Sequence, residues 1–202
     1  MSNIIDTRFA ETRRNFLGAT GRLTLSATAI TILAGCETMA QQSVAAQPMT
    51  SSGSQDVAIL NVALGLENEA IGAYQLGAES GLLQKPVLDT AVRFQSDHKG
   101  HRDALVATIQ KLGGKPVEPK ALGDYAKALN ADTLKSQADV LELAARLELG
   151  ATNAYLGVIP AFKDAQLAKI SGRLAADEAM HWTILNSALG RPLAQGALPF
   201  GA

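Results

Sequence analysis

Six side chains of metal-binding type occur at matched spacing in the two halves of this 202-residue chain. Each half carries one isolated glutamate and, further along, two ligand-type residues separated by two others. The six residues are Glu67, His98, His101, Glu148, Glu178 and His181. Carboxylate and imidazole groups without a thiolate suit iron, manganese or zinc. The i, i+3 spacing puts both members of a pair on one helix face, where they can hold one ion and bridge to another.

The residues around these candidate ligands reveal an internal duplication. Two segments recur further along the chain, with offsets of 81 and 80 positions. The matched segments are 66–74 with 147–155 and 93–101 with 173–181. The mismatch among the ligand residues places His98 opposite Glu178. A single helix hairpin cannot bury its apolar face alone, so two copies predict a four-helix bundle.

The composition favours close-packed helices over a sheet. Hydrophobic residues make up 47% of the chain but aromatic residues only 4%, and alanine and leucine dominate. Lysine and arginine number 18 against 19 aspartate and glutamate, so no basic excess indicates a nucleic-acid partner. The one cysteine, Cys36, excludes both a disulfide within the chain and a thiolate metal site.

Hydrophobic periodicity and helix breakers predict an all-α fold with four long helices. We expect these helices at about 56–80, 86–112, 136–159 and 164–189, with a short helix at about 124–129. Asp56 is the expected N-cap of the first helix, and Gly81 is its expected stop. The connection at 113–136 is long enough to run the length of a bundle, which predicts two hairpins joined by one long crossover. An apolar tail, residues 191–202, is expected to wrap one end of the bundle.

All six candidate ligands lie on the apolar stripe of their expected helix. Glu67 is one turn from Leu64 and from Ile71 and occupies the place of a core residue, whereas Glu69 faces solvent. By the same test Glu148 points inward on its own helix. Three buried carboxylates at one level need compensation, which divalent metals supply more fully than histidine or arginine.

Four further polar residues accompany the ligands in matched pairs. Tyr74 and Tyr155 each follow an isolated glutamate by seven positions, and we expect them to hydrogen-bond near the ligands or to pack in the core. Asp97 and Asp177 either orient a histidine or lie on the surface, and the sequence leaves both roles open.

The ligand pattern resembles that of the ferritin-like superfamily, in particular exported bacterial proteins related to rubrerythrin and bacterioferritin. That family places one glutamate on each of two helices and a Glu-x-x-His pair on each of the other two. The matching residues, within 56–190, are Glu67, Glu148, His101 and Glu178-x-x-His181. The resemblance implies a ferritin-like four-helix bundle that binds one or two ions of iron or manganese, or of zinc. It also implies iron handling or the reduction of an oxidant such as peroxide, with electrons from an external donor.

His98 departs from the family pattern, because it stands where the family has a glutamate. Imidazole brings no negative charge and is expected to offer one nitrogen, so the site is less anionic than the family pattern. It then holds one ion, an unequal pair of ions, or a softer metal such as zinc or copper. Two alternatives stay open: a metal-free bundle serving as a non-catalytic structural or binding lipoprotein, and an incorrect helical register. Whether the protein is an enzyme or a homodimer also stays open.

Residues 1–36 resemble an export signal and are not expected to belong to the fold. Arg13 and Arg14 lie in a segment that resembles a twin-arginine motif, and the segment ending at Cys36 resembles a lipobox. Residues 37–55 are small and polar and predict a flexible tether. The resemblance implies export by the twin-arginine translocase to the periplasm or cell envelope, with membrane attachment through lipidated Cys36. An uncleaved N-terminal anchor helix is the alternative.

Overall fold

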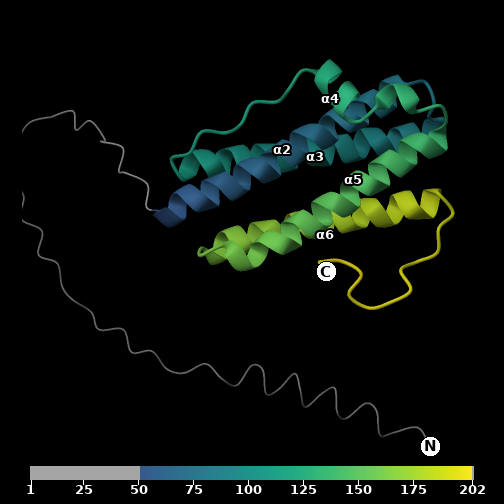
Figure 1. Ribbon diagram of the computed structural model, residues 1–202. Coiled ribbons are helices and arrows are strands. Elements are labelled where there is room, and N and C mark those ends of the chain that lie inside the picture. The colour runs from purple at the N-terminus through teal and green to yellow at the C-terminus, as the bar shows by residue number, and fades with distance from the viewer. Residues whose placement is uncertain (1–50, 202) are drawn as a thin grey trace, which may run out of the picture. The chain divides into compact units, whose positions relative to one another are not determined.

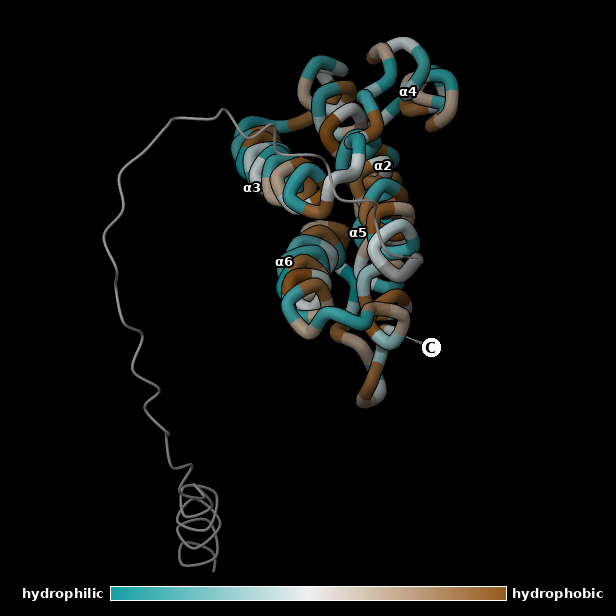
Figure 2. The backbone as a smooth tube through the Cα atoms, turned by 90° about the vertical axis from the view of Figure 1, so that its left-hand side faces the viewer, coloured by the Kyte–Doolittle hydropathy of each residue, from teal (hydrophilic) through white to brown (hydrophobic). Residues whose placement is uncertain are grey.

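The computed structural model describes residues 51–201, and all regular structure in this range is helical. The long helices are α2 (Ser51–Glu79), α3 (Lys85–Lys111), α5 (Gln137–Val158) and α6 (Ala165–Ala188). They lie side by side along most of their length, and a view close to the bundle axis shows them around a shared interior (Figures 1 and 2). The predicted all-α, ferritin-like bundle is confirmed.

The predicted export and lipidation residues, Arg13, Arg14 and Cys36, lie outside the described residues. Within residues 51–201, none of the helices combines the length and the apolar character that crossing a membrane requires.

Local sequence signals account for most helix ends. Ser136 and Asp164 cap α5 and α6, since their side chains accept hydrogen bonds from the backbone N–H groups of Asp139 and Gln166. Pro86 occupies the first turn of α3, where a missing N–H costs nothing. Beyond α2, Gly81 adopts a φ of 70°, a left-handed conformation that favours glycine and ends the helix.

The start of α2 differs from the expectation. The helix begins at Ser51, five residues before Asp56, so residues 51–55 are helical and do not belong to the predicted tether. Asp56 does not cap the helix because it lies within it, with only 6% of its surface exposed. Residues 51–55 contain no proline, and an established helix extends through serine and glycine at a cost of about 1 kcal/mol per residue or less.

Two antiparallel hairpins, α2–α3 and α5–α6, are joined by a crossover that runs along α2 (Figure 1). Asn61 holds its first part, donating to the carbonyl oxygen of Lys115 (3.0 Å) and accepting from the N–H of Val117 (2.8 Å). The crossover continues into α4 (Leu122–Ala128), the 3₁₀ turn η1 (Ala131–Thr133) and then α5. A second 3₁₀ turn, η2 (Ile159–Ala161), follows α5.

A glycine on α2 allows α4 to pack closely against that helix. A Cβ atom on Gly72 would lie 2.7 Å from the ring of Tyr125, which is closer than real Cβ atoms approach other heavy atoms. The Tyr125 hydroxyl in turn accepts a hydrogen bond from the N–H of Lys120 (3.0 Å). A side chain at position 72 would therefore displace α4 and the end of the crossover.

The core consists of two main apolar clusters, each containing one of the paired tyrosines. Tyr155 belongs to the cluster that includes Leu64 and Ile109, and Tyr74 to the cluster that includes Phe94 and Leu185. Both clusters bury their side chains against the polar residues at the middle of the bundle. Burial of these apolar side chains stabilises the fold by roughly 1.5–3 kcal/mol for each large residue. The polar centre therefore lies between two apolar clusters.

The C-terminal tail takes a different course from the one expected. It returns along the side of the α5–α6 hairpin instead of wrapping one end of the bundle (Figure 1). The ring of Phe200 packs edge-on against Trp182, with centroids 5.2 Å apart. The N–H of Gly201 donates to Asn153 Oδ1 on α5 (2.8 Å). An aromatic contact and a backbone hydrogen bond on the hairpin's side thus determine the position of the tail.

Candidate metal centre

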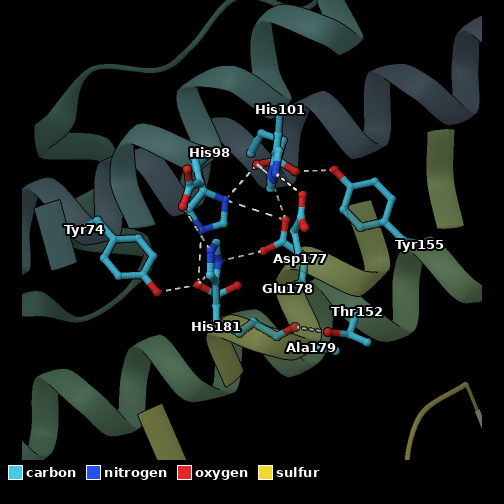
Figure 3. Close-up of polar contacts among 12 residues, drawn as sticks. Tyr74, His98, His101, Thr152, Tyr155, Asp177, Glu178, Ala179 and His181 are labelled. Atoms are coloured by element: carbon cyan, nitrogen blue, oxygen red, sulfur yellow. Dashed lines mark hydrogen bonds and ion pairs between the residues drawn. The ribbon is translucent and has the colours of Figure 1, made fainter. Parts of the chain in front are cut away.

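The four long helices bring all six candidate ligands to one level of the bundle (Figure 3). Glu67 comes from α2, Glu148 from α5, and the two i, i+3 pairs from α3 and α6. All six side chains are buried, and even His101, the most accessible of them, is only 8% exposed. By contrast Glu142, which also lies on α5, is exposed and pairs with Arg191. The helical spacing therefore selects which acids face the interior.

The six side chains form two overlapping groups of four potential ligands. Within each group, one nitrogen or oxygen atom per residue lies within 4.8 Å of those of the other three. The first group is Glu67, His98, His101 and Glu178, and the second is His98, Glu148, Glu178 and His181. His98 and Glu178 belong to both groups, and they are the two residues at which the repeats differ. The geometry thus outlines two adjacent ion positions with a shared pair between them.

His98 presents a different ring nitrogen to each group. Its Nδ1 lies 2.8 Å from Glu67 Oε2, and its Nε2 lies 3.1 Å from Glu148 Oε1. Both ring nitrogens therefore face carboxylate oxygens, one in each group. A neutral imidazole has a single unprotonated nitrogen, so the expectation that His98 offers one nitrogen to a metal is unchanged.

Glu178 lies between the other two histidines and also offers one atom to each group. Its Oε1 is 3.1 Å from His101 Nδ1, and its Oε2 is 3.3 Å from His181 Nδ1. With 0% of its surface exposed, Glu178 is the most completely buried member of the centre. The shared pair thus combines a carboxylate on α6 with an imidazole on α3.

Each paired tyrosine donates a hydrogen bond to the glutamate of the other repeat. The Tyr74 hydroxyl donates to Glu148 Oε1, and the Tyr155 hydroxyl donates to Glu67 Oε1. The two rings approach the centre from opposite sides (Figure 3). Burial raises the pKa of both tyrosines well above 10, and the negative charge of the partner glutamate raises it further. Both hydroxyls therefore stay protonated and fix the orientation of the carboxylates.

The paired aspartates contact the outer nitrogens of two histidines, again across the repeats. Asp177 Oδ2 lies 3.3 Å from His101 Nε2, and Asp97 Oδ2 lies 3.5 Å from His181 Nε2. Asp97 also pairs with Arg93 at 2.9 Å, so it reaches both the surface and the centre. The sequence alone left open whether these aspartates orient a histidine or lie on the surface. Asp97 and Asp177 are 80 positions apart, as are His101 and His181, and this equal offset could have indicated that the aspartates and histidines contact each other.

A polar cleft between α3 and α6 connects the centre to solvent. It has a volume of about 350 Å³, and both His101 and His181 line it. Asp97 and Asp177 stand in the same cleft, next to the histidines that they contact. Water and small solutes can therefore approach the centre from the histidine side.

The carboxylates and imidazoles stabilise each other's charged forms. Burial by itself would lower the pKa of His98, but hydrogen bonds with Glu148 and Glu67 raise it to about 11. Burial likewise opposes ionisation of Glu67, yet hydrogen bonds with His101 and His98 lower its pKa to about 2. For Glu178 the effect of burial prevails and its pKa is raised. A metal ion entering this centre must therefore displace protons from the imidazoles.

Unsatisfied buried atoms indicate that these residues fit a metal. Among the described residues, three buried side-chain atoms make no hydrogen bond: Glu148 Oε2, Glu178 Oε2 and His181 Nδ1, the last two although they lie 3.3 Å apart. All three belong to the second ligand group, and buried polar atoms without partners cost about 1–3 kcal/mol each. Cation coordination would satisfy all of them at once, and oxygen with imidazole ligands suits iron, manganese or zinc.

Comparisons with known proteins agree with the helical fold. The family described as ferritin-like domain matches residues 55–191. A similar solved structure is the crystal structure of a conserved hypothetical protein, rv2844, from Mycobacterium tuberculosis. It superposes with a TM-score of 0.58 and 23% sequence identity over 74% of this chain and 100% of that chain, a likeness of fold alone. No curated protein matches the chain.

Proposed function

The chain belongs to the ferritin-like domain family, and from that premise we propose that it binds two metal ions in its buried Glu/His centre. We propose iron or manganese as the ions, with zinc as the redox-inactive alternative. The function would be iron handling or the reduction of an oxidant such as peroxide. The observation that carries the proposal is the pair of overlapping four-residue groups, in which three buried atoms make no hydrogen bond.

The chain's own residues have separable tasks in this proposal. Glu67, Glu148 and Glu178 would provide carboxylate oxygens, and the three histidines would provide imidazole nitrogens. Tyr74 and Tyr155 hold two of the carboxylates in place through their hydroxyl groups. Bound iron or manganese would supply the electrons that an oxidant takes up.

Access and electron supply follow from the surroundings of the centre. A small oxidant would enter through the cleft between α3 and α6, where Asp97 and Asp177 contact the outer histidine nitrogens. The sequence has one cysteine and so no cysteine cluster that could relay electrons. Ferrous iron, as a substrate, or a separate reductant would have to provide them.

We also propose that the protein works in the cell envelope. The twin-arginine-like motif at Arg13 and Arg14 supports export by the twin-arginine translocase, and the lipobox-like segment supports lipidation at Cys36. Attachment would place the metal centre at the membrane surface, in the periplasm or envelope. Mass spectrometry of the mature protein tests this directly, since processing predicts an acylated N-terminal Cys36.

Metal analysis tests the function. We expect the protein to take up two equivalents of ferrous iron under anaerobic conditions, one for each ligand group. Glu148→Ala and His181→Ala should each lower the metal content, because both residues belong to the second group. Glu142→Ala is the matched control, since this acid lies exposed on the same helix as Glu148. Wild-type protein without metal after reconstitution would contradict the proposal.

A second candidate is a metal-free bundle with a structural or binding role. The observation in its favour is that His98 bonds to two glutamates at once, so that a protonated imidazole satisfies charges that a metal would otherwise balance. Under this alternative Glu148→Ala and His181→Ala would change stability alone. The same metal analysis separates the two candidates.

A further inference from the structure

The two paired tyrosines mark equivalent places on either side of the metal centre, and these places are filled differently. Behind Tyr155 the apolar side chains leave a void of only about 10 Å³. Behind Tyr74 they leave a cavity of about 210 Å³. All four long helices contribute to the larger cavity, near the C-terminal ends of α2 and α6. A duplicated fold thus has one packed side and one hollow side.

Two positions contribute to the hollow when the halves are compared in the register of the repeat. Gly77 on the hollow side stands where the packed side has Val158, an offset of 81. Thr90 stands where the packed side has Ile170, an offset of 80. Both differences replace a larger apolar side chain with a smaller one.

Two other wall positions carry the same residues on both sides. Leu141 and Ala144 line the cavity, and their counterparts Leu60 and Ala63 line the void behind Tyr155. Part of the cavity is therefore the space that the equivalent half fills with the side chains of Val158 and Ile170.

The lining of the cavity selects an uncharged ligand. None of the residues that line it is an aspartate, glutamate, lysine, arginine or histidine. Its two hydroxyl groups are already engaged, since Thr90 donates to the carbonyl oxygen of Pro86 and Tyr74 donates to Glu148. Ile184 also lines the cavity and is 48% exposed, so the space can be reached from solvent. The walls offer dispersion contacts but no free polar group.

We propose that this cavity binds the alkyl chain of a small neutral molecule beside Tyr74. An engineered apolar cavity of about 150 Å³ in another protein stays dry and binds benzene, so a volume of about 210 Å³ suffices for a ligand of this size. It is too small for a helix of another chain, whose diameter with side chains is about 10–12 Å. The bound molecule would touch the ring whose hydroxyl fixes Glu148. The site is separate from the metal ligands and does not depend on the proposed function.

Calorimetric titration of the full chain with a series of linear alcohols, from butanol to octanol, tests the proposal. Each added methylene should tighten binding about fourfold, until the alkyl chain fills the cavity. Thr90→Ile, which copies the residue of the packed side, should weaken octanol binding at least about tenfold by occupying the space. Ile170→Val is the matched control at the equivalent position and should leave binding unchanged.

Three outcomes would overturn the proposal. The first is that wild-type protein binds no alcohol, as when a second copy or residues of the N-terminal segment occupy the cavity. The second is an affinity that does not depend on chain length. The third is that Thr90→Ile and a second filling variant, Ala91→Leu, both bind octanol as wild type does. Ala91 lines the same cavity next to Thr90, so a leucine at position 91 would also fill the space. The test therefore remains decisive if one of the two variants does not fold. The titration needs no metal, so its failure is distinct from a failure to bind iron.

Discussion

The two halves of the bundle are alike in the polar contacts that their tyrosines and aspartates make across the repeat, and different in part of their apolar packing. Tyr74 donates a hydrogen bond to Glu148 of the second half, and Tyr155 donates one to Glu67 of the first half. The paired aspartates and outer histidines cross between the halves in the same way. A change in one half would leave a buried polar group of the other half without its partner. Apolar filling carries no such dependence, and there the halves diverge at Gly77 and Thr90.

The other divergence lies at the middle of the centre. His98 and its counterpart Glu178 are the residues shared by both ligand groups. Each is in contact with both groups, so an exchange of carboxylate for imidazole changes the charge of the whole centre without removing a contact. The halves thus match in the polar contacts that cross between them, and they differ at the shared pair and in the apolar packing behind the tyrosines.

The largest effect is expected from removal of the shared carboxylate. Glu178→Ala should abolish both ion positions, whereas Glu67→Ala should abolish only one, because Glu67 belongs to a single group. Removal of one partner from a buried charged cluster costs about 3–5 kcal/mol, so the metal-free variant should also unfold at lower denaturant. Metal analysis with urea unfolding measures both. Equal metal loss in the two variants would remove the distinction between shared and unshared ligands.

The pH dependence of the metal-free protein should be nearly as large. The pKa values of His98, His101 and His181 rise from 6.5 to about 11, 10 and 9. A raised pKa stabilises the fold below the unfolded value of 6.5, and this contribution disappears as pH rises through 9 to 11. The lowered pKa of Glu67 acts in the opposite sense, since its contribution disappears as pH falls from 4.5 to about 2. Stability should therefore be greatest between about pH 4.5 and 6.5.

Urea unfolding in the presence of a chelator, from pH 4 to pH 10, checks this profile. Metal-loaded protein should show the opposite trend above neutral pH, because protons compete with metal for the imidazoles. An unchanging midpoint between about pH 6.5 and 10 would show that the histidines are not charged partners of the glutamates.

His98→Glu makes position 98 match its counterpart Glu178, and it should change the metal affinity and the stability of the metal-free protein in opposite directions. His98→Glu would place a fourth carboxylate among three others, so the metal-free protein should lose about 1–3 kcal/mol. The more anionic centre should bind iron more tightly, and the increase in melting temperature on loading should exceed that of wild type. His98→Gln, which removes the imidazole without adding charge, is the control. A smaller metal-induced increase in His98→Glu would contradict a charge-based role for position 98.

Much of this arrangement was predictable from the sequence, because it depends on periodicity. Helical spacing selected Glu67 over Glu69 as the inward acid, and both isolated glutamates are buried as expected. Position 98 could not be resolved in the same way, since spacing gives the face of a side chain but not the direction of its ring nitrogens. The cavity behind Tyr74 also escaped prediction, because packing defects depend on side-chain volumes from four helices at once. The start of α2 was predicted five residues too late, because residues 51–55 carry no strong sequence signal for the start of a helix.

The smallest expected effect is the most direct test of the packed and hollow sides. Thr90→Ile adds apolar atoms to a cavity of about 210 Å³ and should stabilise the protein by about 1 kcal/mol. The hydrogen bond that it removes, from Thr90 to Pro86, is exposed and replaceable by water. The mirror change, Ile170→Thr, introduces a hydroxyl where only about 10 Å³ is free and should cost about 1–3 kcal/mol. If the two sides are unequally filled, urea unfolding should show a higher free energy of unfolding for Thr90→Ile and a lower one for Ile170→Thr. Losses of equal size would instead mean that Thr90 and Ile170 are equally well packed, and the hollow side would not exist in solution.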